Sequence, residues 1–152
     1  MSGFRFKLQK LLDLRRHYEQ ESAARLARAR NEASDAQRAV ETLEAMRLAS
    51  AEEVGRAASE TIHAGELQRL SYLVERLDGH IGEAAELSRE AEAVADGLAE
   101  EFEQALVRRR VLDKLHDRDL ATWRTDEERR DRVAMDEIAI DRHARKEEEP
   151  TQ

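Results

Sequence analysis

The chain has 152 residues, one domain's worth, of which 39% are charged and only 4% aromatic. So few large apolar side chains exclude a compact globular core, whereas a hydrophobic content of 40%, largely Ala and Leu, excludes a disordered chain. The net charge of −8 is the balance of 34 acidic and 26 basic residues interspersed along the sequence, which argues against a nucleic-acid binder and indicates long, ion-paired helices.

The sequence contains no Cys, so it supports neither a disulfide framework nor thiolate chemistry. It also lacks the apolar core of a signal peptide and any run of roughly 20 apolar residues that would span a membrane. We therefore expect a cytoplasmic protein without direct membrane insertion.

A first helix is predicted over residues 4–56. Its apolar and small residues recur in alternating steps of three and four, the heptad pattern of a coiled coil. Successive four-residue steps between Leu14 and Leu26 predict a stutter, which would relax the supercoil locally. The predicted seam consists of Leu11, Leu14, Tyr18, Ser22, Leu26, Ala29, Ala33, Ala36, Val40 and Leu43, and it weakens at Arg47 and Ser50.

Residues 55–65 contain the only predicted break in the helical pattern, with a turn over residues 57–64. Gly55 and Gly65 permit left-handed backbone, and Ser59 and Thr61 are able to cap the helix that follows. A turn here predicts an antiparallel hairpin with arms of unequal length. Without it, the chain would be one straight helix or part of a parallel oligomer.

A second helix is predicted over residues 65–146, followed by a disordered tail at residues 147–152. Gly79, Gly82 and Gly97 lie inside this helix and indicate a soft point or a close approach of another segment. The apolar phase does not slip across them. The predicted seam consists of Leu67, Leu70, Val74, Leu77, Ile81 and Ala84, and continues through Leu87, Ala91, Val94, Leu98, Phe102, Ala105, Leu112 and Leu115.

Pairing the two helices across a turn centred near residue 60 places residue i opposite roughly 120 minus i. Leu43 is then predicted to face Leu77, and Leu26 to face Val94, so apolar residues meet apolar residues. This agreement favours an all-α fold, a single coiled-coil domain over residues 1–152 with two long antiparallel helices. The second helix is longer, and its last 30 residues or so, roughly 40 Å of helix, overhang the first.

The overhang is strongly charged but carries several large apolar residues. Residues of opposite charge at positions i and i+4 can form ion pairs, which favours a solvated helix, whereas the unburied apolar stripe favours a docking segment. Both interpretations remain open at this point. The apolar residues are Trp123, Val133, Met135, Ile138 and Ile140.

No group of residues supports catalysis, a cofactor or a metal. Asp113 and His116 have the three-residue spacing of helical metal sites, but a second copy of the pair is absent. The chain lacks a Gly-rich phosphate loop and a nucleophile elbow, and a two-helix structure has no concave interior. We expect no enzymatic activity. The cluster Arg108–Arg110, predicted to lie beside Arg15 and Arg16, suits an acidic protein surface or is simply a solvated helix surface.

Three segments in this order resemble the FliJ family, small coiled-coil components of the flagellar type III export apparatus. The similar segments span nearly the whole chain. They are FRFKLQKLLDLRR at residues 4–16, GELQRLSYLVERL at residues 65–77 with Ile81, and RVLDKLHDR at residues 110–118, followed by MDEIA at residues 135–139 and Arg142.

The resemblance implies an antiparallel two-helix coiled coil like the central stalk of rotary ATPases. It implies binding to the hexameric export ATPase (FliI-like), with the end that bears the termini directed into the ring, and to the export gate (FlhA-like). A FliH-like regulator and export chaperones are further implied partners, and the implied location is peripheral to the inner membrane at the flagellar base. Relatives in virulence secretion systems are the YscO-type proteins.

Two sets of contact residues are expected on this basis. The family's gate surface is aromatic and apolar, but here the first helix has no aromatic residue after Tyr18, so the gate contact is assigned only as a region. The alternative is a structural or dimerising coiled-coil module without an export role, in which the seam is intermolecular. The expected ATPase contacts are Phe4, Phe6, Arg15, Arg16, Arg109, Trp123 and Ile138, and the expected gate contacts are Met46, Leu48, Tyr72 and Leu73.

Overall fold

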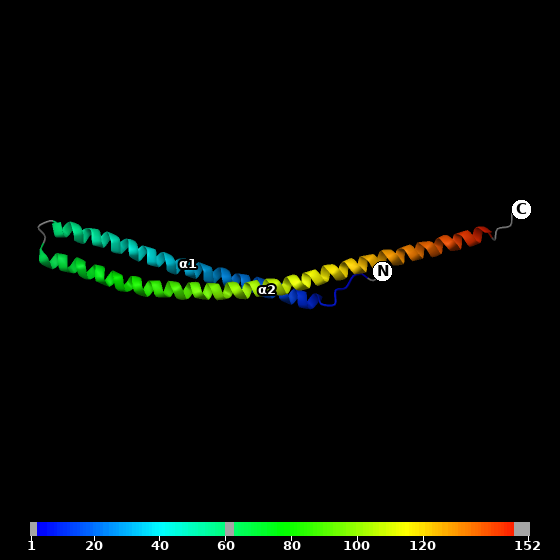
Figure 1. The fold of residues 1–152 in the computed structure, drawn as a ribbon, viewed down its shortest axis with the longest axis horizontal. Helices are drawn as coiled ribbons and strands as arrows, with labels where there is room; N and C mark the ends of the chain where they lie inside the picture. Colours follow the sequence, from blue (N-terminus) through cyan, green and yellow to red (C-terminus); the bar gives the residue numbers. More distant parts are fainter. Residues whose placement is uncertain (1–2, 60–62, 148–152) are drawn as a thin grey trace. The chain divides into compact units, whose positions relative to one another are not determined.

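The computed structural model describes residues 3–59 and 63–147, and these residues form two long helices and no strand. Helix α1 (Gln9–Ser59) has 51 residues and helix α2 (Ala64–Glu147) has 84 (Figure 1). The two helices pack against each other, which confirms the predicted all-α class. Thr61 and the predicted disordered tail, apart from Glu147, lie outside the described residues.

The chain divides into two units, each of which contains part of both helices. One unit is Tyr18–Ala105, here called the hairpin unit. The other comprises Met1–His17 and Leu106–Gln152 and is here called the terminal unit. The hairpin unit holds the connection between α1 and α2, and the terminal unit holds the chain ends.

Helix α1 begins at Gln9, five residues after the predicted start. Residues 3–6 are irregular, and the helix starts where the Gln9 amide donates a hydrogen bond to the Phe6 carbonyl (3.2 Å). The irregular segment places the Phe6 ring against α2, where it is only 8% exposed. Packing of the half-buried Phe4 and the buried Phe6 against α2 therefore replaces the first predicted helical turn.

The connection between the helices does not use its glycines as expected. Gly55 lies inside α1 and Gly65 inside α2, and no glycine among the described residues has a positive φ. The Ser59 hydroxyl donates to the Arg56 carbonyl (2.7 Å), so Ser59 belongs to the last turn of α1 instead of capping α2. The first turn of α2 is closed by the Glu66 amide, which donates to the His63 carbonyl (2.8 Å).

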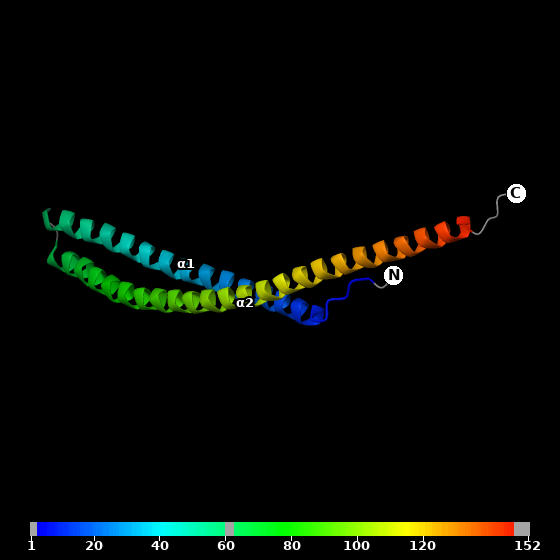
Figure 2. The same cartoon turned by 45° about the vertical axis from the view of Figure 1, so that its right-hand side comes forward.

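Within the hairpin unit the two helices run antiparallel and side by side (Figures 1 and 2). Arg47 pairs with Asp78, the Ser88 hydroxyl donates to the Gln37 side chain (3.3 Å), and Arg25 pairs with Glu101 (3.6 Å).

In these pairs residue i lies opposite about 125 minus i, so the predicted register of 120 minus i is wrong. Helix α1 extends to Ser59, three residues beyond its predicted end, and this moves the midpoint of the hairpin.

The seam of α1 is an unbroken heptad, so the predicted stutter is wrong. Leu12 is 1% exposed and Ser22 is fully buried, whereas Leu14 is 61% and Tyr18 is 37% exposed. The intervening seam positions are the half-buried Arg15 and Glu19, and such side chains can pack their stems while their charged ends reach water. The predicted seam was displaced by one position because the prediction considered only apolar residues.

The seam of α2 shows the same kind of shift. Leu87 is 62% and Val94 is 57% exposed, while the following residues, Ser88 and Ala95, are nearly buried. Leu87 and Val94 are thus outside the seam, and Leu26 does not pack on Val94. Small side chains occupy many of the buried positions, so the helices bury little apolar area per layer. The buried apolar residues of the hairpin unit are Leu26, Ala29, Ala33, Val40, Ala57, Leu77, Ala95 and Ala105.

The three glycines inside α2 do not mark a close approach. A Cβ atom built on Gly79, Gly82 or Gly97 would have no neighbouring heavy atom within 4 Å. These positions are open to solvent, and an alanine would fit at each without displacing anything.

Candidate interaction surfaces

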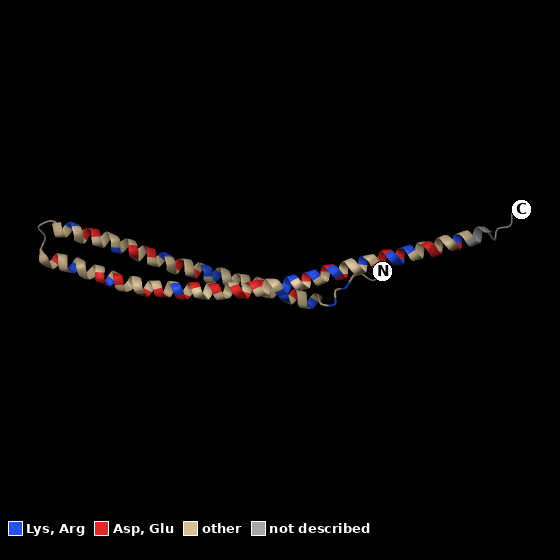
Figure 3. Cartoon of the chain, viewed as in Figure 1, with Lys and Arg blue, Asp and Glu red and all other residues tan. Residues whose placement is uncertain are grey.

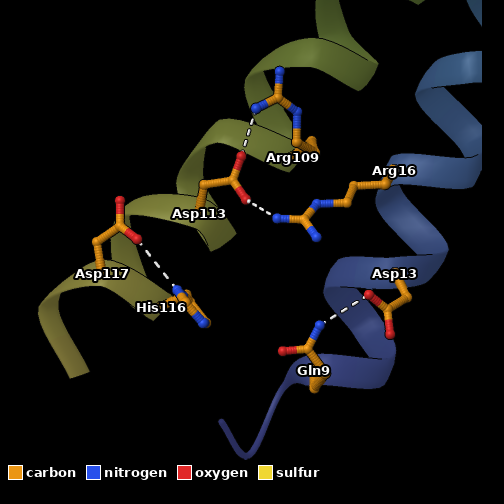
Figure 4. A network of polar contacts seen from close by, with 7 residues as sticks. All are labelled: Gln9, Asp13, Arg16, Arg109, Asp113, His116 and Asp117. Carbon is orange, nitrogen blue, oxygen red and sulfur yellow. Dashed lines mark hydrogen bonds and ion pairs between the residues drawn. The ribbon is translucent and has the colours of Figure 1, made fainter. Parts of the chain in front are cut away.

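An ion-pair network joins the two helices of the terminal unit (Figure 4). One carboxylate oxygen of Asp113 accepts a hydrogen bond from Arg16 of α1 at 3.0 Å, and the other accepts one from Arg109, one turn earlier on α2. Asp113 was noted in the sequence only for its spacing from His116. Its role in the network was not predicted, because the Arg16 contact depends on the register of the two helices.

The network lowers the pKa of Asp113 below its ordinary value of 3.8. The hydrogen bond from Arg109 is the main cause, and the hydrogen bond from Arg16 and the charges of both guanidinium groups act in the same direction. Partial burial opposes these effects. The carboxylate is therefore held ionised between two cations.

An aromatic cluster lies one turn further along α2. The rings of Phe4 and Phe6 meet the His116 ring edge-on, with centroids 5.5 and 5.1 Å away, and the Phe4 and Trp123 centroids are 6.0 Å apart. His116 Nδ1 lies 3.2 Å from a carboxylate oxygen of Asp117 (Figure 4). His116 was not predicted as part of a contact site, since a single His on a helix gives no signal of ring packing.

The structure brings most of the predicted ATPase contacts together in these two clusters. Phe4 and Trp123 are half-buried and Phe6 is buried; both Phe rings contact His116, and Trp123 contacts Phe4. Arg16 and Arg109 are both paired with Asp113. Arg15 is half-buried at a seam position, and Ile138 is 49% exposed.

Between residues 128 and 143, α2 buries none of its side chains. Every residue from 128 to 143 is exposed, although this stretch includes four large apolar residues. Their exposed fractions are 53% for Val133, 69% for Met135, 49% for Ile138 and 68% for Ile140. Apolar side chains that remain in water along a helix are typical of a surface that is covered by a partner.

The four predicted gate contacts are also exposed, and all lie in the hairpin unit. Met46 is 53% and Leu48 is 61% exposed on α1, while Tyr72 is 60% and Leu73 is 45% exposed on α2. Tyr72 lines a surface hollow together with Arg69 and Glu75. These side chains are available for contact with another protein.

Neither a metal site nor a membrane span is found in the part of the chain that the structure describes. Across residues 3–59 and 63–147, no three His, Asp or Glu side chains are arranged to hold a metal ion. Over the same residues, neither helix has a stretch apolar enough, at sufficient length, to cross a bilayer.

Residues 4–148 match the family described as the flagellar FliJ protein. The chain belongs to the FliJ family. The match covers nearly all of the chain and agrees with the resemblance of the three sequence segments. No curated protein and no solved structure matches the chain.

Membership of the FliJ family confirms part of the expected function. The chain is a flagellar export-related coiled-coil protein, and the family is a non-enzymatic export component. A coiled-coil module without any export role is thereby disfavoured.

Proposed function

We propose that this chain is a stalk-like component of the flagellar type III export apparatus that binds the export ATPase ring and couples it to the export gate. The observation that carries the proposal is the exposed stretch of α2 at residues 128–143, whose apolar side chains find no cover within the described chain. Family membership supplies the setting in which a partner would cover them.

The proposed ring-binding region is the terminal unit. Ile138 would contact the ATPase directly, because its side chain is 49% exposed and therefore accessible to a partner. Phe4, Phe6 and Trp123 would act by holding the irregular N-terminal segment against α2 around His116. The remaining proposed ring contacts are Arg15, Arg16 and Arg109.

A truncation after Glu127 tests ring binding. It removes the exposed stretch but keeps Trp123 and the Asp113 network, so the helical content of residues 1–127 should persist in circular dichroism. Co-purification with the export ATPase of the same genome should be lost. The matched control is the full-length chain with Arg129→Ala, a single change at an exposed position of the same stretch. Undiminished binding of the truncated chain would overturn the ring-docking assignment.

The proposed gate-binding region is in the hairpin unit and comprises Met46, Leu48, Tyr72 and Leu73. The double variant Tyr72→Ser/Leu73→Ser should weaken binding to the export-gate protein while leaving ATPase binding unchanged. The opposite pattern would show that the two surfaces are assigned the wrong way round.

Further partners are proposed from the family setting. They are a FliH-like regulator and export chaperones, and the proposed location is the cytoplasmic side of the inner membrane at the flagellar base, held there through protein contacts. Both proposals rest on membership of the FliJ family.

A further inference from the structure

The paired part of the terminal unit is strongly basic, although the chain as a whole is acidic. Residues 3–17 and 106–119 contain ten Lys and Arg but four Asp and no Glu, in a chain whose net charge is −8. Figure 3 shows this concentration of basic residues on both helices. Its arrangement around the two helices is uneven.

One edge of the helix pair is occupied by ion pairs. The seam residues here include Leu12 on α1, and Arg109, Leu112 and His116 on α2. The residues that directly follow seam positions meet at one edge, as the contact of Arg16 with Asp113 shows. Three of the four acidic residues lie at such positions, and the fourth, Asp119, is in the seam itself. The three are Asp13, Asp113 and Asp117.

The opposite edge holds only apolar and basic side chains. It is formed by the residues that directly precede seam positions, and it contains no carboxylate. Leu14 is 61%, Val111 is 57% and Leu11 is 38% exposed. We call this the preceding edge; its members are Leu11, Leu14, Arg108, Val111, Leu115 and Arg118. Lys114 lies next to it on α2, four residues before Arg118.

We propose that the preceding edge docks on an acidic surface of a partner protein that presents carboxylates around an apolar patch. Exposed Leu and Val side chains favour an apolar contact, and the exposed Arg108 beside them favours negative charge. Arg118 contributes less, because it already pairs with the adjacent Asp119 at 3.4 Å. An anionic membrane offers the same charge, but it is an extended surface and would repel the remainder of this acidic chain. A local protein surface does not have that cost.

This inference rests on the proposed ring-binding function. It specifies which face of the terminal unit contacts the ATPase and what chemistry the ATPase surface has. It also differs from the contacts expected from the sequence. Arg16 and Arg109 already neutralise Asp113, whereas Arg108 is exposed on the edge that has no carboxylate.

The test compares Arg108→Glu with Arg110→Glu. Both arginines are exposed, they are two residues apart on α2, and the change in charge is the same, but Arg110 follows a seam residue instead of preceding one. Affinity for the purified export ATPase is measured at about 50 and 200 mM salt. Arg108→Glu should weaken binding about tenfold and flatten its salt dependence, and Arg110→Glu should stay within about twofold of the natural chain.

A second variant tests the apolar part of the edge. Leu14→Ser should weaken binding severalfold without changing the salt dependence, since it removes no charge. Because Leu14 is mostly exposed, the melting temperature of the Leu14→Ser variant should be close to that of the natural chain.

The outcomes separate the two levels of the proposal. If the natural chain binds the ATPase and the two arginine variants bind equally well, the preceding edge is not the docking face and the inference fails alone. If the natural chain does not bind the ATPase, the proposed function fails and the inference with it. A third outcome is that the natural chain binds phosphatidylglycerol vesicles, and Arg108→Glu abolishes this binding without affecting ATPase binding. That result would identify a lipid contact and overturn the proposal of a protein partner.

Discussion

Arg16 and Asp113 are 97 residues apart in the chain, yet their side chains meet at 3.0 Å. Arg109 reaches the same carboxylate from within α2. One carboxylate thus links α1 to α2 near the N-terminal end of α1. This contact shows which residues of α1 and α2 lie opposite each other in the terminal unit.

The Asp113 network predicts a pH-dependent contribution to stability. The pKa of Asp113 is lowered in the folded chain, so the stabilisation is fully present above the ordinary carboxyl pKa of about 4 and is lost as the pH falls through the lowered value. Asp113→Asn should lower the free energy of unfolding by about 1 kcal/mol at pH 7. The difference from the natural chain should shrink below about pH 4. Asp131→Asn, at an exposed position of α2, is the control, and an equal effect there would contradict the prediction.

Trp123 provides an optical test of the aromatic cluster, because it is the only tryptophan of the chain. Its ring centroid lies 6.0 Å from that of Phe4. Phe4→Ala should expose the indole to water, shift its emission to longer wavelength and increase its quenching by iodide. Tyr72→Ala, in the hairpin unit, should leave the emission unchanged. An unaltered spectrum in Phe4→Ala would show that the N-terminal segment does not rest on α2 in solution.

Two leucines ten residues apart on α2 should differ sharply in their contribution to stability. Leu77 is 6% exposed in the seam, whereas Leu87 is 62% exposed beside it. Leu77→Ala should cost about 2–3 kcal/mol in the free energy of unfolding, and Leu87→Ala less than about 0.5 kcal/mol. Guanidinium denaturation followed by circular dichroism measures both. Similar losses would mean that the seam runs through Leu87.

The glycines inside α2 predict a stabilising substitution. Gly79, Gly82 and Gly97 are helical, and an added Cβ would meet no atom within 4 Å. Replacing each by Ala should raise the free energy of unfolding by up to about 1 kcal/mol, because alanine loses less backbone freedom on forming a helix. Thermal melts of the three single variants test this. A lower melting temperature in any of them would contradict the prediction.

The sequence predicted the existence and direction of the two helices because hydrophobic period and turn composition are local properties. The predicted position of the seam was less accurate. Arg15, Glu19 and Ser88 occupy seam positions, and the larger apolar neighbours Leu14, Tyr18 and Leu87 are outside it. In a seam made largely of small residues, apolar character no longer identifies the buried side, so only the strict three-four spacing identifies it.

The candidate site was predictable only in part, for a related reason. Phe4, Phe6 and Trp123 were expected as ATPase contacts, but their packing in one aromatic cluster was not predicted. His116, which contacts the rings of Phe4 and Phe6, and Asp113 were not expected, because both contacts depend on how the N-terminal segment and α1 lie against α2. The predicted register places residue 104 opposite Arg16, nine residues from Asp113, so it conceals this contact.

The uninterrupted heptad has a consequence for how the arms of the hairpin unit keep their alignment. Displacing one arm by seven residues, about 10 Å, would place seam positions opposite seam positions again. Alanine and serine at many of these positions would distinguish the two alignments only weakly. The polar pairs that bridge the arms, Arg47 with Asp78, Ser88 with Gln37 and Arg25 with Glu101, therefore help to select the observed alignment. Replacing these polar residues should therefore weaken the preference for the observed alignment.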